Sequence, residues 1–242
     1  MTTWRNVLVA AAVLPCLPLL ACETGVGALA APERLRAACE EAVAAVLAEE
    51  PGIVAVVGPG TQSLLHNEGA LMASQDLELP VGVRIGHGRA TEAPVSGLPM
   101  ALSVGARLLQ QAGWSGPVCA YELDDARNWP TNGEDGVNLA GWADRVGLLV
   151  MGNGPTRAGA DGARRPDPRA EEIDAGIAAA LARGDADGFF PNMDAALARE
   201  LGVSGRSPWQ LLDGADEDLT THRLLCAEII DGVSCFVATW SP

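Results

Sequence analysis

Lysine is absent from this sequence of 242 residues, and all sixteen basic residues are arginine. A chain without lysine cannot form a lysine Schiff base, which excludes ordinary pyridoxal-phosphate catalysis. It also cannot supply the lysine of a GxxxxGK[ST] phosphate-binding loop. The formal net charge of −15 leaves no basic surface that could release phosphate counterions. We therefore expect neither nucleic acid nor an anionic membrane surface as a partner.

Long apolar runs and paired cysteine motifs are missing as well. No uncharged apolar run reaches the roughly 18 residues that a membrane-spanning helix needs. The six cysteines stand at positions 16, 22, 39, 119, 226 and 235, and no two of them have CxxC spacing. This spacing argues against a structural zinc knuckle, and the large apolar fraction of 48% argues against a disulfide-dependent fold.

Short apolar runs alternate with amphipathic segments, which is typical of parallel β–α–β units. Strands are predicted at residues 6–14, 53–57, 118–122 and 146–151, with a shorter one at 81–85. Helices are predicted at 32–49, 98–112, 137–144, 169–183, 194–201 and 208–212. The chain ends in a predicted hairpin, 222–230 and 233–240, with an Asp-Gly turn. The sequence thus predicts a single α/β domain over residues 1–242, with three layers, a largely parallel or mixed central sheet and helices on both faces.

The stretch VLVAAAVLPCLPLLACETG, residues 7–25, allows two interpretations. As a lipoprotein signal it would be processed before Cys22. As a buried strand it leads into a loop that carries Cys16. Prolines interrupt the apolar run, and cleavage would remove a central strand of a parallel sheet. We therefore favour the strand, and with it a cytoplasmic protein with reduced cysteines; the processed lipoprotein is the alternative.

Four stretches of the chain follow the order of a known family: AAVLPCLPLL (11–20), LLVMGNGPTR (148–157) with DPRAEEID (167–174), ELGVSGRSPWQLLDGA (200–215) and GVSCFVATW (232–240). Together they resemble the actinobacterial branch of the LigB-like superfamily, the catalytic subunits of class III extradiol ring-cleaving dioxygenases. The resemblance implies an α/β fold with a mixed central sheet, and ring cleavage at a ferrous ion held by histidines.

The residues at the family's functional positions differ from its pattern. Cys16 stands in a Pro-Cys-Leu-Pro stretch where the family has an iron-ligating histidine. The turn after the second strand ends at Thr61 instead of a second ligand, and the nearest histidine is His66. Thr156 takes the place of the acid–base histidine. Because dioxygen-activating iron needs two histidines and a carboxylate, we do not expect catechol cleavage or stoichiometric iron.

Candidate site residues lie in the loops that follow the predicted parallel strands, 15–25, 58–69, 122–136 and 152–168, because sites of such sheets form at the carboxyl ends of the strands. Cys16 could act as a nucleophile or as an acid–base group. Clustered carboxylates can raise one another's pKa and supply an acid or base. The candidate catalytic residues are Cys16, Thr156, Glu122 and Asp124, with Asp125 in the same acidic cluster. The candidate substrate-binding residues are Thr61, His66, Asn153 and Arg157.

Three functional hypotheses follow. The first is an iron-independent enzyme on the dioxygenase scaffold, which acts on a small organic molecule through Cys16 and needs no cofactor. The second is a non-catalytic binding or partner protein that descends from the same fold. The third is a metalloprotein whose non-heme metal ion is held by Cys16, His66 and Glu228. Assembly of identical chains stays open in all three.

Overall fold

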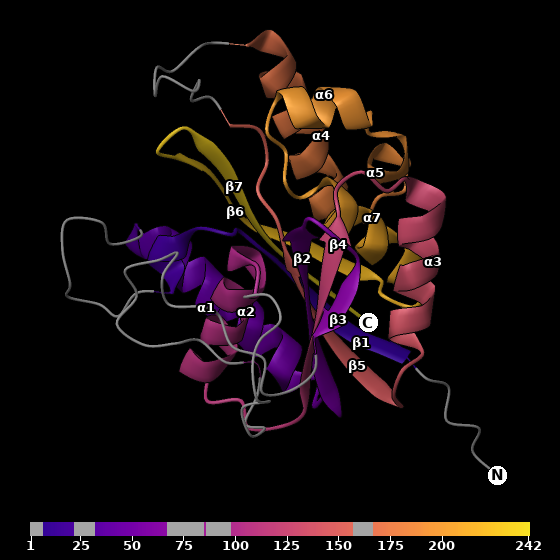
Figure 1. Ribbon diagram of the computed structural model, residues 1–242. Helices are drawn as coiled ribbons and strands as arrows, with labels where there is room; N and C mark the ends of the chain where they lie inside the picture. Colours follow the sequence, from indigo (N-terminus) through magenta and orange to yellow (C-terminus); the bar gives the residue numbers. More distant parts are fainter. Residues whose placement is uncertain (1–6, 22–31, 67–84, 86–97, 157–166) are drawn as a thin grey trace.

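The computed structural model describes residues 7–21, 32–66, 85, 98–156 and 167–242, and these form one seven-stranded sheet (Figure 1). The strand order is β3-β4-β2-β5-β1-β7-β6. The four parallel strands are β1 (Val7–Leu14), β2 (Ile53–Gly60), β4 (Val118–Asp124) and β5 (Arg145–Met151). The short strand β3 (Leu64–His66) runs antiparallel to β4, while β6 (Thr221–Ile230) and β7 (Val233–Ser241) form an antiparallel hairpin beside β1. The expected mixed α/β sheet with a C-terminal hairpin is confirmed.

Strand β1 lies inside the sheet, between β5 and β7. All of its residues except the first are buried, as its uninterrupted apolar sequence predicts. It pairs parallel with β5 and antiparallel with β7, so both of its edges are hydrogen-bonded. The interpretation of this stretch as a buried strand is therefore confirmed for residues 7–14, while residue 6 lies outside the described residues. Cleavage before Cys22 would remove an interior strand.

Helices cover both faces of the sheet (Figure 1). One face contacts α1 (Glu33–Ala48) and α2 (Met100–Gln111). The other contacts α4 (Pro168–Arg183) and α7 (Arg206–Ala215), and α3 (Trp129–Ala140) packs against α7. Two short helices, α5 (Phe189–Asn192) and α6 (Ala195–Glu200), connect α4 to α7. Alternate strand residues feed two cores: Val54 and Val56 pack toward α1 and α2, whereas Ala55 and Val57 pack toward α4 and α7.

Helix α3 begins eight residues before the predicted helix at 137–144, within the stretch that the sequence indicated to be an acidic loop. Pro130 lies in its first turn, where a missing N–H group is tolerated. In the sequence, Gly133 and Gly136 favour turns. In the structure they instead allow α3 to approach α7 closely. A Cβ atom on Gly136 would lie 2.1 Å from the carbonyl oxygen of Leu211. The glycines thus serve helix packing, which no local pattern reveals.

Other boundaries differ less. Strands β2 and β4 are each longer than predicted, because Gly58–Gly60 pair with Glu122–Asp124. Strand β3 was expected to be loop, and most of the predicted strand at 81–85 lies outside the described residues. The predicted Asp-Gly turn is confirmed, since Asp231 and Gly232 both have positive φ angles, 49° and 85°.

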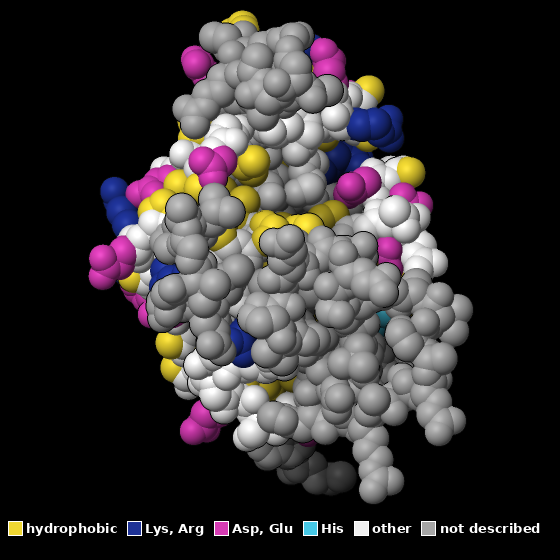
Figure 2. Space-filling model, turned by 60° about the vertical axis from the view of Figure 1, so that its left-hand side comes forward, with side chains coloured by type: hydrophobic (Ala, Val, Ile, Leu, Met, Phe, Trp, Pro, Cys, Tyr) yellow, Lys and Arg dark blue, Asp and Glu magenta, His cyan; other side chains and the backbone are white. Residues whose placement is uncertain are grey.

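The described surface has no continuous basic stripe on the face that Figure 2 presents. Acidic and arginine side chains are interspersed there (Figure 2). Among the helices that the structure describes, none is both long and apolar enough to cross a membrane.

Candidate functional site

The carboxyl ends of β4, β2, β5 and β1 lie side by side at one edge of the sheet. The residues that follow them are 125–128, 61–63, 152–155 and 15–17, and they bring Asp125, Thr61, Asn153 and Cys16 to this edge. The sequence predicts the site here because parallel strands end together.

Asn153 joins the loop after β1 to the segment that enters α7. Its side-chain Oδ1 accepts a hydrogen bond from the backbone N–H of Cys16 at 2.8 Å. Its own backbone N–H donates to Ser204 Oγ at 3.1 Å, and its carbonyl accepts from Gly205 N–H at 3.0 Å. These bonds hold three segments of the edge in place, and the expected contact of Asn153 with substrate stays a prediction.

Cys16 lies at the end of β1, as predicted, just before the short 3-10 helix Pro18–Leu20. Only 9% of the residue is exposed. Burial raises the pKa of its thiol far above the usual range, and the nearby Cys235 and Asp125 raise the pKa further. The thiol is therefore protonated near neutral pH, whereas nucleophilic catalysis requires the thiolate.

This protonation state predicts slow alkylation. At pH 8, iodoacetamide should modify Cys16 at least about tenfold more slowly in the folded protein than in the protein unfolded in urea. Peptide mass spectrometry after timed labelling gives both rates, and Cys39, whose pKa burial raises to about 12, serves as the internal comparison. Faster labelling of Cys16 in the folded chain would contradict this prediction and favour the nucleophile.

Glu122 and His66 form a buried pair at the other side of the edge. Glu122 Oε2 lies 3.1 Å from His66 Nε2, and both side chains are more than nine-tenths buried. Glu122 Oε1 accepts hydrogen bonds from the backbone N–H groups of Thr61 and Gln62, at 2.8 and 3.3 Å. Glu122 was a candidate catalytic residue and Thr61 and His66 were candidate ligands of substrate. Their contacts form a clasp, called here the Glu122 clasp, that closes the turn between β2 and β3, and the catalytic and binding roles stay predictions.

Asp124, the other catalytic candidate of the acidic cluster, is likewise engaged in a turn. Its Oδ1 accepts the backbone N–H of Ala126 at 2.8 Å. Its backbone N–H donates to Ser63 Oγ at 3.3 Å. The next residue, Asp125, accepts no such hydrogen bond from the described residues and lines a cavity.

The cavity at this edge has a volume of about 210 Å³. We call it the α6–α7 cavity, because most of its wall comes from α6 and the segment that enters α7. The lining residues are Asp125, Ala195, Ala198, Arg199, Gly202, Val203, Ser204 and Arg206. A second cavity, of about 450 Å³ between α1 and α2, has mostly apolar walls and only one charged lining residue, Glu40. Convergent polar groups therefore distinguish the α6–α7 cavity.

Arg206 is fixed in the wall of the α6–α7 cavity by backbone carbonyls. Its Nε donates to the carbonyl of Met193 at 3.0 Å, and its Nη1 donates to those of Arg127 and Asp125 at 2.9 and 3.4 Å. Only 6% of the residue is exposed, and burial lowers the pKa of its guanidinium below the usual value. These bonds tie the acidic loop after β4 to the start of α7.

The proposed metal set of Cys16, His66 and Glu228 is not brought together. His66 lies on β3 and Glu228 on β6, the two opposite edge strands of the seven-stranded sheet. Six strand spacings of about 4.8 Å separate these strands. Glu228 pairs with Arg34 at 3.3 Å. Within the described residues, no three histidine, cysteine or acidic side chains form a group that could hold a metal ion.

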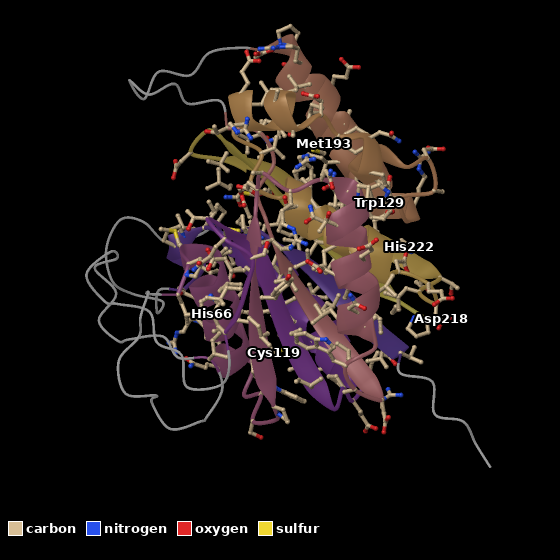
Figure 3. All side chains as sticks on the ribbon, turned by 45° about the vertical axis from the view of Figure 1, so that its right-hand side comes forward. His66, Cys119, Trp129, Met193, Asp218 and His222 are labelled. Carbon is tan, nitrogen blue, oxygen red and sulfur yellow. The ribbon has the colours of Figure 1, made fainter. Side chains whose placement is uncertain are left out.

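The described histidines are also far apart, because His66 lies on β3 and His222 on β6, the two opposite edge strands. Figure 3 shows His66 and His222 on opposite sides of the molecule. His222 contacts the Trp240 ring edge-on and lies 3.6 Å from Asp216, away from the carboxyl edge of the parallel strands. His87, Arg157 and Cys22 lie outside the described residues.

Thr156, expected at the position of the family's acid–base histidine, is part of the framework. Its backbone N–H donates to the carbonyl of Leu201 at 2.8 Å, and it forms a bridge with Val233. Its methyl group packs against Gly202, where a Cβ atom would lie 2.3 Å from it. A catalytic role for Thr156 stays a prediction.

The sequence did not single out Arg199, Ser204 or Arg206. Ser204 and Arg206 belong to the stretch GVSGRSP (202–208), whose Gly-Arg-Ser-Pro order marks only a helix start, and Arg199 lies three residues before it. Packing of α6 and α7 over the loop after β4 brings them to Asp125.

No family model and no curated protein matches this sequence. Among solved structures, the chain is similar to the crystal structure of an uncharacterized protein, JW3007, from Escherichia coli K12. The two share 15% sequence identity with a TM-score of 0.57, over 97% of this chain and 100% of that one. At this identity the similarity establishes the α/β fold over nearly the full length of both chains, and the fold alone.

Proposed function

We propose that the protein is an enzyme that transforms a small organic molecule in the α6–α7 cavity, with Asp125 as its acid–base group. The observation that carries this proposal is the composition of the cavity wall. A carboxylate, two guanidinium groups and a hydroxyl converge there, at the edge where α/β sheets place their sites. The proposal keeps the expected class of substrate and moves the acid–base role from Cys16 to Asp125.

The surroundings of Asp125 suit proton transfer near neutral pH. Although Asp125 is exposed at the edge of the cavity, the protein atoms around its carboxyl group and the charge of Asp124 raise its pKa. Arg206 and Arg199 act in the opposite direction, and the result is a pKa of about 6. A group with such a pKa is available as a base above pH 6 and as an acid below it.

Two earlier expectations remain predictions beside this proposal. Descent from the LigB-like superfamily is supported by the quoted stretches, and a shared α/β arrangement is compatible with it. Covalent catalysis by Cys16 would require substrate binding to activate a thiol that is protonated in the free protein. No metal is assigned, because the set of Cys16, His66 and Glu228 does not fit one ion.

The proposal is tested by substrate discovery with a paired variant. Wild-type protein and Asp125→Asn are incubated with a mixture of small organic metabolites, and mass spectrometry identifies compounds that are consumed. If Asp125 acts as a base, we expect the rate of consumption by the wild type to rise as pH increases through about 6; if it acts as an acid, the rate should fall over the same range. In Asp125→Asn the rate of consumption should be at least about a hundredfold lower.

The matched control is Asp187→Asn, which removes an exposed carboxylate that pairs with Arg183. It should retain wild-type rates. Equal consumption by Asp125→Asn and the wild type would contradict the role of Asp125. Compounds that bind without being consumed would contradict the proposed enzymatic function and favour the non-catalytic hypothesis.

A further inference from the structure

Arg206 carries a buried charge that Asp125 and Asp194 influence electrostatically, but no described carboxylate forms an ion pair with it. All of its hydrogen bonds go to neutral carbonyl groups, and no carboxylate of the described residues lies within ion-pair distance. Removing a cation from water without a counter-ion is costly. Its Nη2 group makes no hydrogen bond to the described part of the chain, although the residue lines the α6–α7 cavity.

A second cation and a hydroxyl donor share this wall. Arg199 is exposed on α6, and its guanidinium forms no hydrogen bond or ion pair with the residues that the structure describes. Ser204 Oγ accepts a hydrogen bond from Asn153 N–H, and its own O–H is able to donate to a further acceptor. The start of α7, which also favours negative charge, lies between Ser204 and Arg206.

We propose that the α6–α7 cavity binds the carboxylate group of a small organic acid, with Arg206, Arg199 and Ser204 as donors. This inference rests on the proposed function and specifies its substrate class. Guanidinium groups present paired N–H donors that match the two oxygens of a carboxylate. The volume of about 210 Å³ restricts the ligand to a compact molecule.

The charge of the wall favours a carboxylate over a phosphate. Among the lining residues, two arginines and an ionised Asp125 leave one net positive charge, which a monoanion neutralises. Asp194, outside the lining, also acts on Arg206 and further disfavours a second negative charge. A dianionic phosphate would add a second negative charge beside Asp125. An ionised Asp125 repels a bound anion, and protonation of Asp125 removes this repulsion. Anion binding should therefore be tighter below pH 6 than above it.

Isothermal titration calorimetry with sodium benzoate tests the inference on the full-length protein. Benzamide serves as the neutral molecule of the same shape, and inorganic phosphate as the competing anion. We expect benzoate to bind at least about tenfold more tightly than benzamide and phosphate, and more tightly at pH 5 than at pH 8. In Asp125→Asn the difference between the two pH values should disappear.

Arginine variants identify the donors. Arg199→Gln, at an exposed position that leaves the fold intact, should weaken benzoate binding about tenfold. Arg206→Lys should also weaken it, because a lysine ammonium cannot form the paired contact. Arg183→Gln removes an exposed arginine of α4 and should leave benzoate binding unchanged.

The outcomes separate this inference from the proposed function. Equal binding of benzamide and benzoate, or unchanged binding in Arg199→Gln, would overturn the carboxylate subsite, even if Asp125-dependent consumption of neutral compounds is found. Arginine-dependent benzoate binding in a protein that consumes no compound would support the carboxylate subsite and overturn only the proposed enzymatic function.

Discussion

Replacement of Glu122 by alanine is expected to lower the free energy of unfolding by about 3 kcal/mol. The Glu122 clasp satisfies two backbone N–H groups and the ring of His66, which is itself buried. Alanine would leave all three without this acceptor and would open a void between β3 and β4. Urea-induced unfolding at pH 7, followed by tryptophan fluorescence, measures the change.

Two variants control for the loss of a carboxylate. Glu134→Ala removes an exposed acidic side chain from α3 and should change stability by less than about 0.5 kcal/mol. Glu122→Gln keeps an oxygen acceptor of the same length and should lose less stability than Glu122→Ala. If Glu122→Ala unfolds at the same urea concentration as Glu134→Ala, the clasp makes no contribution to stability.

The second large effect is expected at the contact between α3 and α7. Gly136→Ala would place a Cβ atom 2.1 Å from the Leu211 carbonyl oxygen, a backbone atom that cannot rotate away. Forced separation of the helices should cost at least about 2 kcal/mol, even after the gain of about 1 kcal/mol in helix propensity. Thermal unfolding followed by circular dichroism measures the loss.

Gly141→Ala provides the matched comparison at the end of the same helix. There the nearest atom to a new Cβ would be the Asn138 carbonyl oxygen at 3.4 Å, an ordinary contact. This variant should stay within about 0.5 kcal/mol of the wild type. Similar unfolding temperatures for the two alanine variants would show that α3 and α7 separate without loss, contrary to the packing described here.

The fold was predictable from sequence where the signal is local. Buried parallel strands appear as apolar runs, and the Asp-Gly turn fixes the hairpin register. Helix α3 was mispredicted because its glycines are explained only by α7, which lies more than 60 residues later. Local patterns therefore identified most elements and failed where a distant neighbour determines the residue type.

The acidic cluster shows the same limit at the site. The sequence indicated that Glu122, Asp124 and Asp125 follow a strand, but not which of them faces a cavity. Alternation along β4 directs Glu122 to the face of the sheet that α1 and α2 cover, where it reaches His66 of β3 and forms the clasp, and Asp124 closes a turn. Only Asp125 remains for the α6–α7 cavity. Its arginine partners come from α6 and α7, so their convergence depends on tertiary packing.

The interior position of β1 also has a consequence for how the chain folds. Its two hydrogen-bonding neighbours are β5, which begins at Arg145, and β7, which ends at Ser241. During synthesis one edge of the apolar segment VLVAAAVL can be paired only after β5 has been made, and the other only after β7 has been made. Contacts between residues so distant in sequence slow folding, and an unpaired apolar strand promotes aggregation in the meantime. Expression yield should depend on chaperones that shield the nascent amino-terminal segment.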